Sequence, residues 1–275
     1  MGADIKKLKD RIKSVDSTLH LTTAMGLVAS SKIRRAMEAM LRGREYEAAV
    51  LQAIEPLLGS PECRRSPYMR GETGEGKTAL VVIAGDRGLA GGYNANVFRL
   101  LRSYPDAVLF PVGKRACDRL GGETCYAESF DYAQARGLAY ELCRGFVERA
   151  YDRVGVLCTQ YHSMLSQEAR IVWLLPLTPT EGCDRASNGG HTATVEFEPS
   201  ERAVLDAAVP EYLAGYLVSA VRESFACEIA ARRTAMDSAG KNAREMIDGL
   251  QLQYDRARQS AITQEITEIV AGSGT

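Results

Sequence analysis

Two glycine-rich segments carry residue types that could bind a phosphate group. The first, at 71–78, reads Gly-Glu-Thr-Gly-Glu-Gly-Lys-Thr and matches the phosphate-loop pattern G-x-x-x-x-G-K-[ST]. In a phosphate loop a strand precedes the glycines and a helix follows, so that backbone N–H groups face the phosphates. Here a polar segment precedes the glycines and the apolar run at 79–84 follows them, and two glutamates inside the loop would repel a polyphosphate. The inverted order predicts a surface loop.

The second segment, at 85–94, reads Gly-Asp-Arg-Gly-Leu-Ala-Gly-Gly-Tyr-Asn and does follow an apolar run. It lacks the G-x-G-x-x-G spacing of a dinucleotide site. Asp86 and Arg87 also stand where the backbone of such a site must approach the phosphates. A tight turn from a strand into a helix is the favoured interpretation.

Patterns for catalysis or metal binding are absent from the sequence. There is no G-x-S-x-G or H-E-x-x-H, the seven cysteines form no C-x-x-C, and the only histidines are His20, His162 and His191. We therefore predict no catalytic residue, no metal and no cofactor. The scattered cysteines are interpreted as reduced, buried side chains of a cytoplasmic protein.

The elements that position these segments are indicated by composition. The chain has 275 residues, a net charge of -1 and 45% hydrophobic residues, which excludes a disordered or collagen-like chain and a protein that binds nucleic acid with its whole surface. The N-terminus has no secretory signal, and no apolar run approaches the roughly 18 residues of a membrane span. All nine prolines lie between Pro56 and Pro210, so the two proline-free ends are candidate long helices.

Heptad periodicity supports a helix at each end. Steps of three and four from Ile5 reach eleven positions, of which nine are apolar when Ala is counted. These positions are Ile5, Leu8, Ile12, Val15, Leu19, Thr22, Gly26, Ala29, Ile33, Ala36 and Met40. The small residues at 22, 26 and 29 would let a partner approach closely. A similar series runs from Met236 to Ala261, and Pro210 suits the first turn of this second helix.

The lengths of the helices decide how they pack. Helices at 3–55 and 211–272 would span about 80 Å and about 93 Å, whereas a compact domain of about 125 residues has a radius of gyration of about 14 Å. The helices must therefore pair with each other, antiparallel because the chain leaves and re-enters one domain. The longer one should overhang by ten or more residues.

The middle of the chain predicts an α/β domain. Apolar strands are expected at 79–84, 108–112, 154–159 and 171–175, with helices at about 93–103, 114–120 and 130–153 and surface loops at 56–78 and 178–192. Strands alternating with helices indicate a largely parallel sheet. We therefore divide the chain into an N-terminal helix at 1–55, a central Rossmann-like α/β domain at 56–199 and a C-terminal helix at 200–275.

Charge on the N-terminal helix leaves two interpretations open. Basic clusters at 6–9 and 32–35 flank the segment 17–31, which contains no Asp, Glu, Lys or Arg. The clusters could form a solvated face around a buried stretch. Alternatively, a partner could surround the uncharged zone and meet the clusters with acidic surfaces.

Several segments resemble the gamma-subunit family of F-type ATP synthases, over almost the whole chain. They are Ile12–Thr18 (IKSVDST), Thr23–Lys32 (TAMGLVASSK), the turn GDRGLAGGYN, Arg233–Ala239 (RTAMDSA) and Tyr254–Val270 (YDRARQSAITQEITEIV). The resemblance implies a non-catalytic, bacterial-type rotor. Its two terminal helices form an antiparallel coiled coil inside a hexamer of alpha and beta subunits, and its α/β domain binds the epsilon subunit and the ring of c subunits. It further implies peripheral attachment at the cytoplasmic face of the bacterial inner membrane.

Residues carried over by matching motif are expected to contact partners. Met25, Arg232, Arg258, Gln259 and Thr263 match family positions that face the beta-subunit loops, and Phe197 and Glu198 match the foot that meets the c ring. Thr23 and Gly26 depart from the family pattern, in which Lys and an acid are usual. The alternative is a structural coiled-coil adapter with an α/β head and no motor role.

Overall fold

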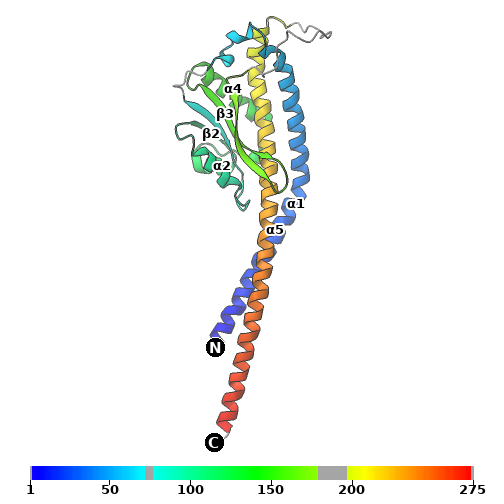
Figure 1. The fold of residues 1–275 in the computed structure, drawn as a ribbon, viewed down its shortest axis with the longest axis vertical. Helices are drawn as coiled ribbons and strands as arrows, with labels where there is room; N and C mark the ends of the chain where they lie inside the picture. Colours follow the sequence, from blue (N-terminus) through cyan, green and yellow to red (C-terminus); the bar gives the residue numbers. More distant parts are fainter. Residues whose placement is uncertain (1, 72–76, 179–196, 274–275) are drawn as a thin grey trace. The chain divides into compact units, whose positions relative to one another are not determined.

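The computed structural model describes residues 2–71, 77–178 and 197–273 (Figure 1). The chain divides into two compact units, one made of the residues up to Ser31 together with those from Arg232 onward, and one made of Lys32–Ala231. The phosphate-loop-like motif falls mostly on 72–76 and the predicted loop at 178–192 falls mostly on 179–196, both outside the described residues. The strand that follows the motif begins at Thr78, which confirms that no helix follows its glycines.

The first unit is a pair of antiparallel helices, the N-terminal part of α1 (Gly2–Leu58) and the C-terminal part of α5 (Glu201–Ser273). Small residues allow close packing, because a Cβ on Gly26 would lie 3.7 Å from Met236 Cβ and one on Gly240 would lie 3.7 Å from Thr22 Oγ1. These contacts confirm the predicted close approach, and the partner that makes it is α5 of the same chain.

In the second unit a four-stranded sheet has the order β2-β1-β3-β4. β1 (Thr78–Ile83) is parallel to both β2 (Val108–Val112) and β3 (Arg153–Tyr161), whereas β4 (Gln167–Leu175) is antiparallel to β3. The predicted α/β class with a largely parallel sheet is thereby confirmed. The remaining elements are α2 (Tyr93–Leu101), α3 (Lys114–Leu120), α4 (Tyr132–Val147) and three 3-10 turns at Cys63–Arg65, Pro67–Met69 and Ala127–Ser129.

Burial on both faces of the sheet explains the uninterrupted apolar run of β1. Ala79, Val81 and Ile83 enter one core cluster with α4, α1 and the first half of α5, while Leu80 and Val82 enter a second cluster with α2. Successive strand residues point to opposite faces, so a central strand covered on both sides is apolar at every position. Figure 1 shows α2 and α4 beside the strands.

The helix at the C-terminal end begins at Glu201, within the segment 200–275 assigned to it but before the first turn expected at Pro210. Pro210 lies inside α5, which starts at Glu201 behind Ser200, whose hydroxyl accepts a hydrogen bond from the N–H of Ala203. An internal proline costs a helix about 3 kcal/mol, and each fully buried leucine contributes about 2 kcal/mol. Leu205 and Leu213 are fully buried on either side of the proline and offset that cost.

Helix α4 ends earlier than the predicted 130–153. Arg149 adopts a left-handed φ of 63°, and the N–H of Ala150 donates to Gly145 O, which closes the helix in the manner of a C-terminal cap. The predicted surface loop at 56–78 is also partly wrong, because Leu57, Cys63 and Tyr68 belong to the main core cluster. The six cysteines within the described residues are all free, and five of them are buried.

Helix α5 also contains one 18-residue window that is long and apolar enough to cross a membrane by length and composition alone. The sequence prediction concerned uninterrupted apolar runs, and charged residues such as Asp206, Glu211 and Arg222 interrupt this part of α5. In the protein 67% of the window is buried, as it would be in the central helix of a folded core.

Candidate partner-contact surfaces

The residues predicted to meet the beta-subunit loops fall into two groups on the paired helices. Arg258, Gln259 and Thr263 lie within two turns of α5 and are exposed, and the Thr263 hydroxyl donates to Gln259 O at 2.9 Å. Arg232 is half-buried at the other end of the same stretch, about 39 Å away along the helix. Met25 of α1 is also half-buried. The structure therefore brings three of the five together and separates the other two from them.

The C-terminal end of α5 extends past the start of α1. The contacts of Gly26 with Met236 and of Gly240 with Thr22 set a register in which α1 begins opposite about residue 260. Residues 262–272 are all exposed, as the predicted overhang requires.

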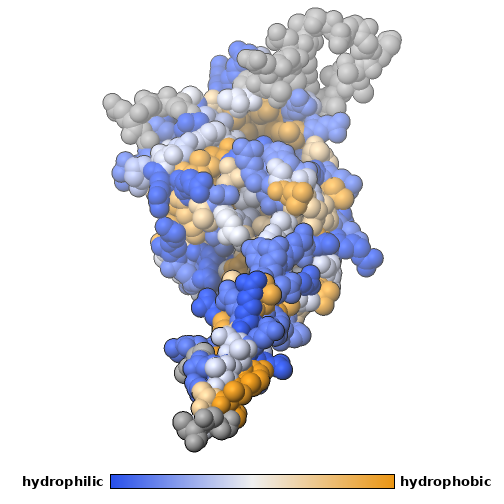
Figure 2. All heavy atoms as spheres, turned by 60° about the horizontal axis from the view of Figure 1, so that its bottom comes forward, coloured by the Kyte–Doolittle hydropathy of each residue, from blue (hydrophilic) through white to orange (hydrophobic). Residues whose placement is uncertain are grey.

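An apolar stripe lies on this overhang. Ile262, Ile266, Ile269 and Val270 are 44%, 56%, 70% and 64% exposed and follow the spacing of one helix face. Figure 2 shows hydrophobic spheres gathered near the tip of this unit. A single helix with an exposed apolar face gains stability when a partner covers that face.

The two residues predicted to form the foot differ in exposure. Phe197 is half-buried and packs against the main core cluster of the second unit, whereas Glu198 is exposed. Only Glu198 is therefore fully available to a partner, and Phe197 anchors the segment that carries it.

Basic side chains of α1 meet carboxylates of the same chain. Lys32 Nζ lies 2.5 Å from Glu128 Oε1, and Arg34 lies 4.0 Å from Glu38. Lys32 thus has a close carboxylate partner within the chain, whereas the Arg34 side chain is 90% exposed.

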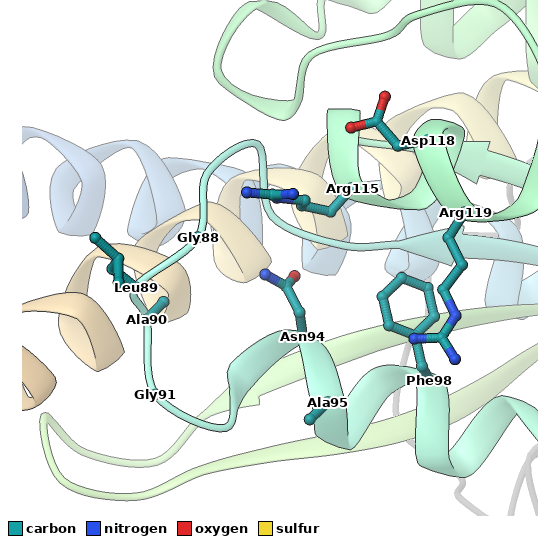
Figure 3. Close-up of a pocket in the computed structure, with 10 residues that line it drawn as sticks. All are labelled: Gly88, Leu89, Ala90, Gly91, Asn94, Ala95, Phe98, Arg115, Asp118 and Arg119. Carbon is teal, nitrogen blue, oxygen red and sulfur yellow. The ribbon is translucent and has the colours of Figure 1, made fainter.

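An open groove lies beside the glycine-rich turn that follows β1 (Figure 3). It has a volume of about 640 Å³ and is bordered by the backbone of 88–91 and by Asn94, Phe98, Arg115 and Arg119. Figure 3 shows Arg115 reaching toward Gly88, and the Arg119 guanidinium lies 4.4 Å from the centre of the Phe98 ring. The groove therefore carries two guanidinium groups together with the carboxylate of Asp118.

The turn itself is occupied by a carboxylate of the same chain. Glu228 of α5 is 1% exposed, and its two carboxylate oxygens accept hydrogen bonds from the N–H groups of Asp86 at 3.1 Å and Arg87 at 3.2 Å. In nucleotide-binding α/β folds, N–H groups at this position bind phosphate. The turn therefore serves as a connection to α5, which gives a physical reason for its missing nucleotide fingerprint.

Sequence reasoning missed Glu228 as a residue of interest. The available signal was one acidic residue inside the otherwise uncharged run 224–231, on a face expected to be apolar. A carboxylate in such a run requires hydrogen-bond donors from elsewhere in the fold, and the glycine-rich turn supplies them.

Comparison with known proteins identifies the family. The family model described as ATP synthase matches residues 4–275. The ATP synthase gamma chain of Geotalea uraniireducens is 36% identical over 98% of each chain, and that of Ruminococcus albus is 38% identical over 98% of each chain. The chain belongs to the ATP synthase gamma chain family. A further relative at 36% identity, covering 99% of each chain, is the sodium ion specific ATP synthase gamma chain of Acetobacterium woodii.

Chains in solved structures of mitochondrial ATP synthases share the fold. The rotor of Euglena gracilis mitochondrial ATP synthase aligns with a TM-score of 0.67 at 20% identity, over 95% of this chain and 100% of that one. A chain of the central stalk of Tetrahymena thermophila mitochondrial ATP synthase aligns with a TM-score of 0.60 at 21% identity, over 80% of this chain and 99% of that one. At these identities the likeness concerns the fold.

Proposed function

We infer that this chain is the central-stalk rotor subunit of an F-type ATP synthase. Family membership over nearly the whole chain carries this conclusion. The antiparallel helix pair with an uncovered end, attached in sequence to an α/β domain, supplies the parts that a rotor needs. The chain transmits rotation of the membrane c ring to the alpha and beta subunits, where catalysis takes place, and performs no catalysis itself.

The partners follow from this role. The helix pair occupies the hexamer of alpha and beta subunits, and the α/β domain binds the epsilon subunit and the c ring. The exposed isoleucines of 262–272 support this arrangement, because they need a surrounding partner. As part of the complex the chain is peripheral to a membrane, and we place it on the cytoplasmic face of the bacterial inner membrane.

Individual contact residues form part of the proposal. Arg258, Gln259 and Thr263 face the beta-subunit loops from one patch, and Met25 and Arg232 do so from other positions on the paired helices. Glu198 meets the c ring, positioned by Phe197. Support comes from the exposure of Arg258, Gln259, Thr263 and Glu198 and from the contact of Phe197 with the core.

Replacing Arg258, Gln259 and Thr263 together by Ala tests the proposed patch. Fewer than about a third of interface residues cost more than about 1 kcal/mol when truncated, so one such loss among the three should lower ATP-driven ion pumping by the reconstituted complex about fivefold. Arg256→Ala is the matched control, because it removes an exposed arginine from the same helix two residues away. Pumping by the triple variant equal to that of the control would contradict the proposed contacts.

The adapter alternative is separated from the rotor by purification. A rotor carrying an affinity tag should co-purify with two larger subunits that hydrolyse ATP. Recovery of the full chain alone, monomeric and fully folded, would favour an adapter.

A further inference from the structure

A continuous set of polar contacts connects both long helices through the glycine-rich turn. At its centre Asp86 is 8% exposed, and its carboxylate accepts hydrogen bonds from three backbone N–H groups. The donors are Lys114 at 3.1 Å, Ala127 at 2.8 Å and Glu128 at 2.9 Å. Asp86 thereby joins the turn after β1 to the start of α3 and to the 3-10 turn Ala127–Ser129.

One end of this set is on α5. Glu228 is buried and accepts hydrogen bonds from the N–H groups of Asp86 and Arg87, which bond the turn to α5. The side chain of Asp86 bonds the same turn to the 3-10 turn. Close contact accompanies the bonds, since a Cβ added to Gly85 would lie 2.8 Å from Glu228 Cδ. Glycine at 85 is therefore required for the carboxylate to reach the turn.

The other end is on α1. Glu128, whose N–H is held by Asp86, accepts a hydrogen bond from Lys32 Nζ at 2.5 Å. Both side chains of this ion pair are about two-fifths exposed, at 40% and 45%. Such a pair adds little to folding stability, but it joins α1 to the 3-10 turn of the α/β domain.

Both helix contacts lie at the limit of the second unit. Lys32 is its first residue and Glu228 lies three residues before its last, Ala231. Beyond these points each helix belongs to the other unit. The hydrophobic driving force has no preferred direction, whereas hydrogen bonds weaken when their angles change. The polar contacts at this limit therefore add a directional restraint on each helix to the interdigitated packing of the core.

We propose that four residues, Lys32, Glu128, Asp86 and Glu228, form a clamp that fixes the rotational position of both helices on the α/β domain. The clamp carries torque between the helices and the domain. The four residues are positioning residues. This inference rests on the proposed rotor function, because only a rotor places a torsional load on the contacts. A competing role for Lys32, contact with an acidic partner surface, makes different predictions about Glu128.

Torsional fluctuation in the assembled complex tests the clamp. With the hexamer fixed to a surface, stalled by nucleotide, and a probe on the α/β domain, the angular variance of the probe measures torsional compliance. Lys32→Gln and Glu128→Gln should each raise the variance by roughly 1.5-fold or more, and the double variant should add nothing further, because both remove one contact. Glu228→Gln, which keeps the shape and half of the acceptors, should also raise it.

Exchange of the two charges provides the decisive arm. Lys32→Glu combined with Glu128→Lys should return the variance to that of the unmodified complex, since the pair is restored in reverse. Arg34→Gln is the matched control, because it removes a neighbouring positive charge whose carboxylate partner lies on α1 itself. It should leave the variance unchanged. Unchanged variance in both single variants, or failure of the exchange to restore it, would overturn the clamp and favour a partner contact for Lys32.

Failure of the proposed function would look different. If ATP did not rotate the probe in the unmodified complex, the rotor function itself would be wrong. If the unmodified complex rotated and the variants matched it in variance, only the clamp would be wrong.

Discussion

At the scale of single residues, half-buried charges lie where α1 and α5 meet each other and the end of β3. Glu223 accepts from Arg44 at 2.5 Å and from the N–H of Tyr161 at 2.8 Å. Glu47 accepts from the Ser219 hydroxyl at 2.8 Å. Burial raises the pKa of Glu47, the hydrogen bond from Ser219 opposes this shift, and the nearby charge of Glu223 adds to it. Charged groups at such positions determine which faces of α1 and α5 pack against each other. Their burial costs some folding stability.

Glu47→Gln should reveal that cost. Because the pKa of Glu47 in the folded protein lies above its ordinary value of 4.5, folding favours the protonated carboxyl. Its favourable contribution is complete below the unfolded pKa and is lost as the pH rises through the folded pKa. Gln keeps an acceptor for Ser219 without the charge, so the variant should be more stable than the unmodified chain at pH 7.5. The difference should vanish below about pH 4.5.

Trp173 provides the measurement. It is the only tryptophan and lies on β4, so its fluorescence during urea unfolding reports on the second unit. The control is Glu45→Gln on the exposed side of α1, which should show no such pH-dependent gain. Equal stability of the Glu47 variant and the unmodified chain at both pH values would contradict the assigned cost of burial.

At the scale of elements, local patterns predicted what local physics determines. The strand at 108–112 and the helix at 114–120 were predicted with the bounds that the structure has. The segment 200–275 was assigned to the C-terminal helix, but Pro210 was placed in its first turn. A proline is permitted inside a helix only when the surrounding core offsets its cost, which the sequence alone does not reveal. The predicted strand at 171–175 was shorter than β4, because the first half of β4 carries the charged residues Glu168 and Arg170. β4 is an edge strand, which tolerates such residues.

The candidate contacts were predictable to a different degree. Arg258, Gln259 and Thr263 could be placed together because they share one helix. The connection of Asp86 to Glu128 and Glu228 joins positions up to 142 residues apart and depends on the tertiary fold. Sequence periodicity carries no information on such pairs.

The junction between β2 and α3 gives a test at this scale. Gly113 has a φ of +93°, and a Cβ there would lie 1.9 Å from Ala84 O, where β1 and β2 end side by side. Gly113→Ala should therefore lose about 3 kcal/mol or more of unfolding free energy, from the left-handed backbone and the clash together. Trp173 fluorescence in urea measures the loss.

Gly121→Ala is the matched control for this junction. Gly121 has a similar φ of +85° at the other end of α3, but a Cβ there meets nothing within 4 Å. It should lose only about 1 kcal/mol, the cost of the backbone conformation. Equal losses in the two variants would show that the close approach to Ala84 does not constrain the sheet edge.

At the scale of the whole chain, the two units derive stability from different sources. The second unit has core clusters on both faces of its sheet. The first has only the seam between two helices, with Ala29, Met236 and Ala243 among its buried residues, and α5 continues beyond it with residues 262–272 exposed. Isolated helical segments shorter than about 12 residues are marginal in water. Local stability should therefore decline along α5 toward its C-terminus.

Amide hydrogen exchange of the full chain tests this gradient. In the purified chain the amides of 262–272 should exchange within about tenfold of the unprotected rate, because fraying alone exposes them, while those of 213–221 should be protected by the core. In the assembled complex the amides of 262–272 should become strongly protected, since a partner that covers Ile262, Ile266 and Ile269 stabilises the last turns. Protection already present in the purified chain would mean that the overhang is stable alone. Absence of added protection in the complex would mean that no partner surrounds it, which would remove the main structural support for a shaft held inside a hexamer.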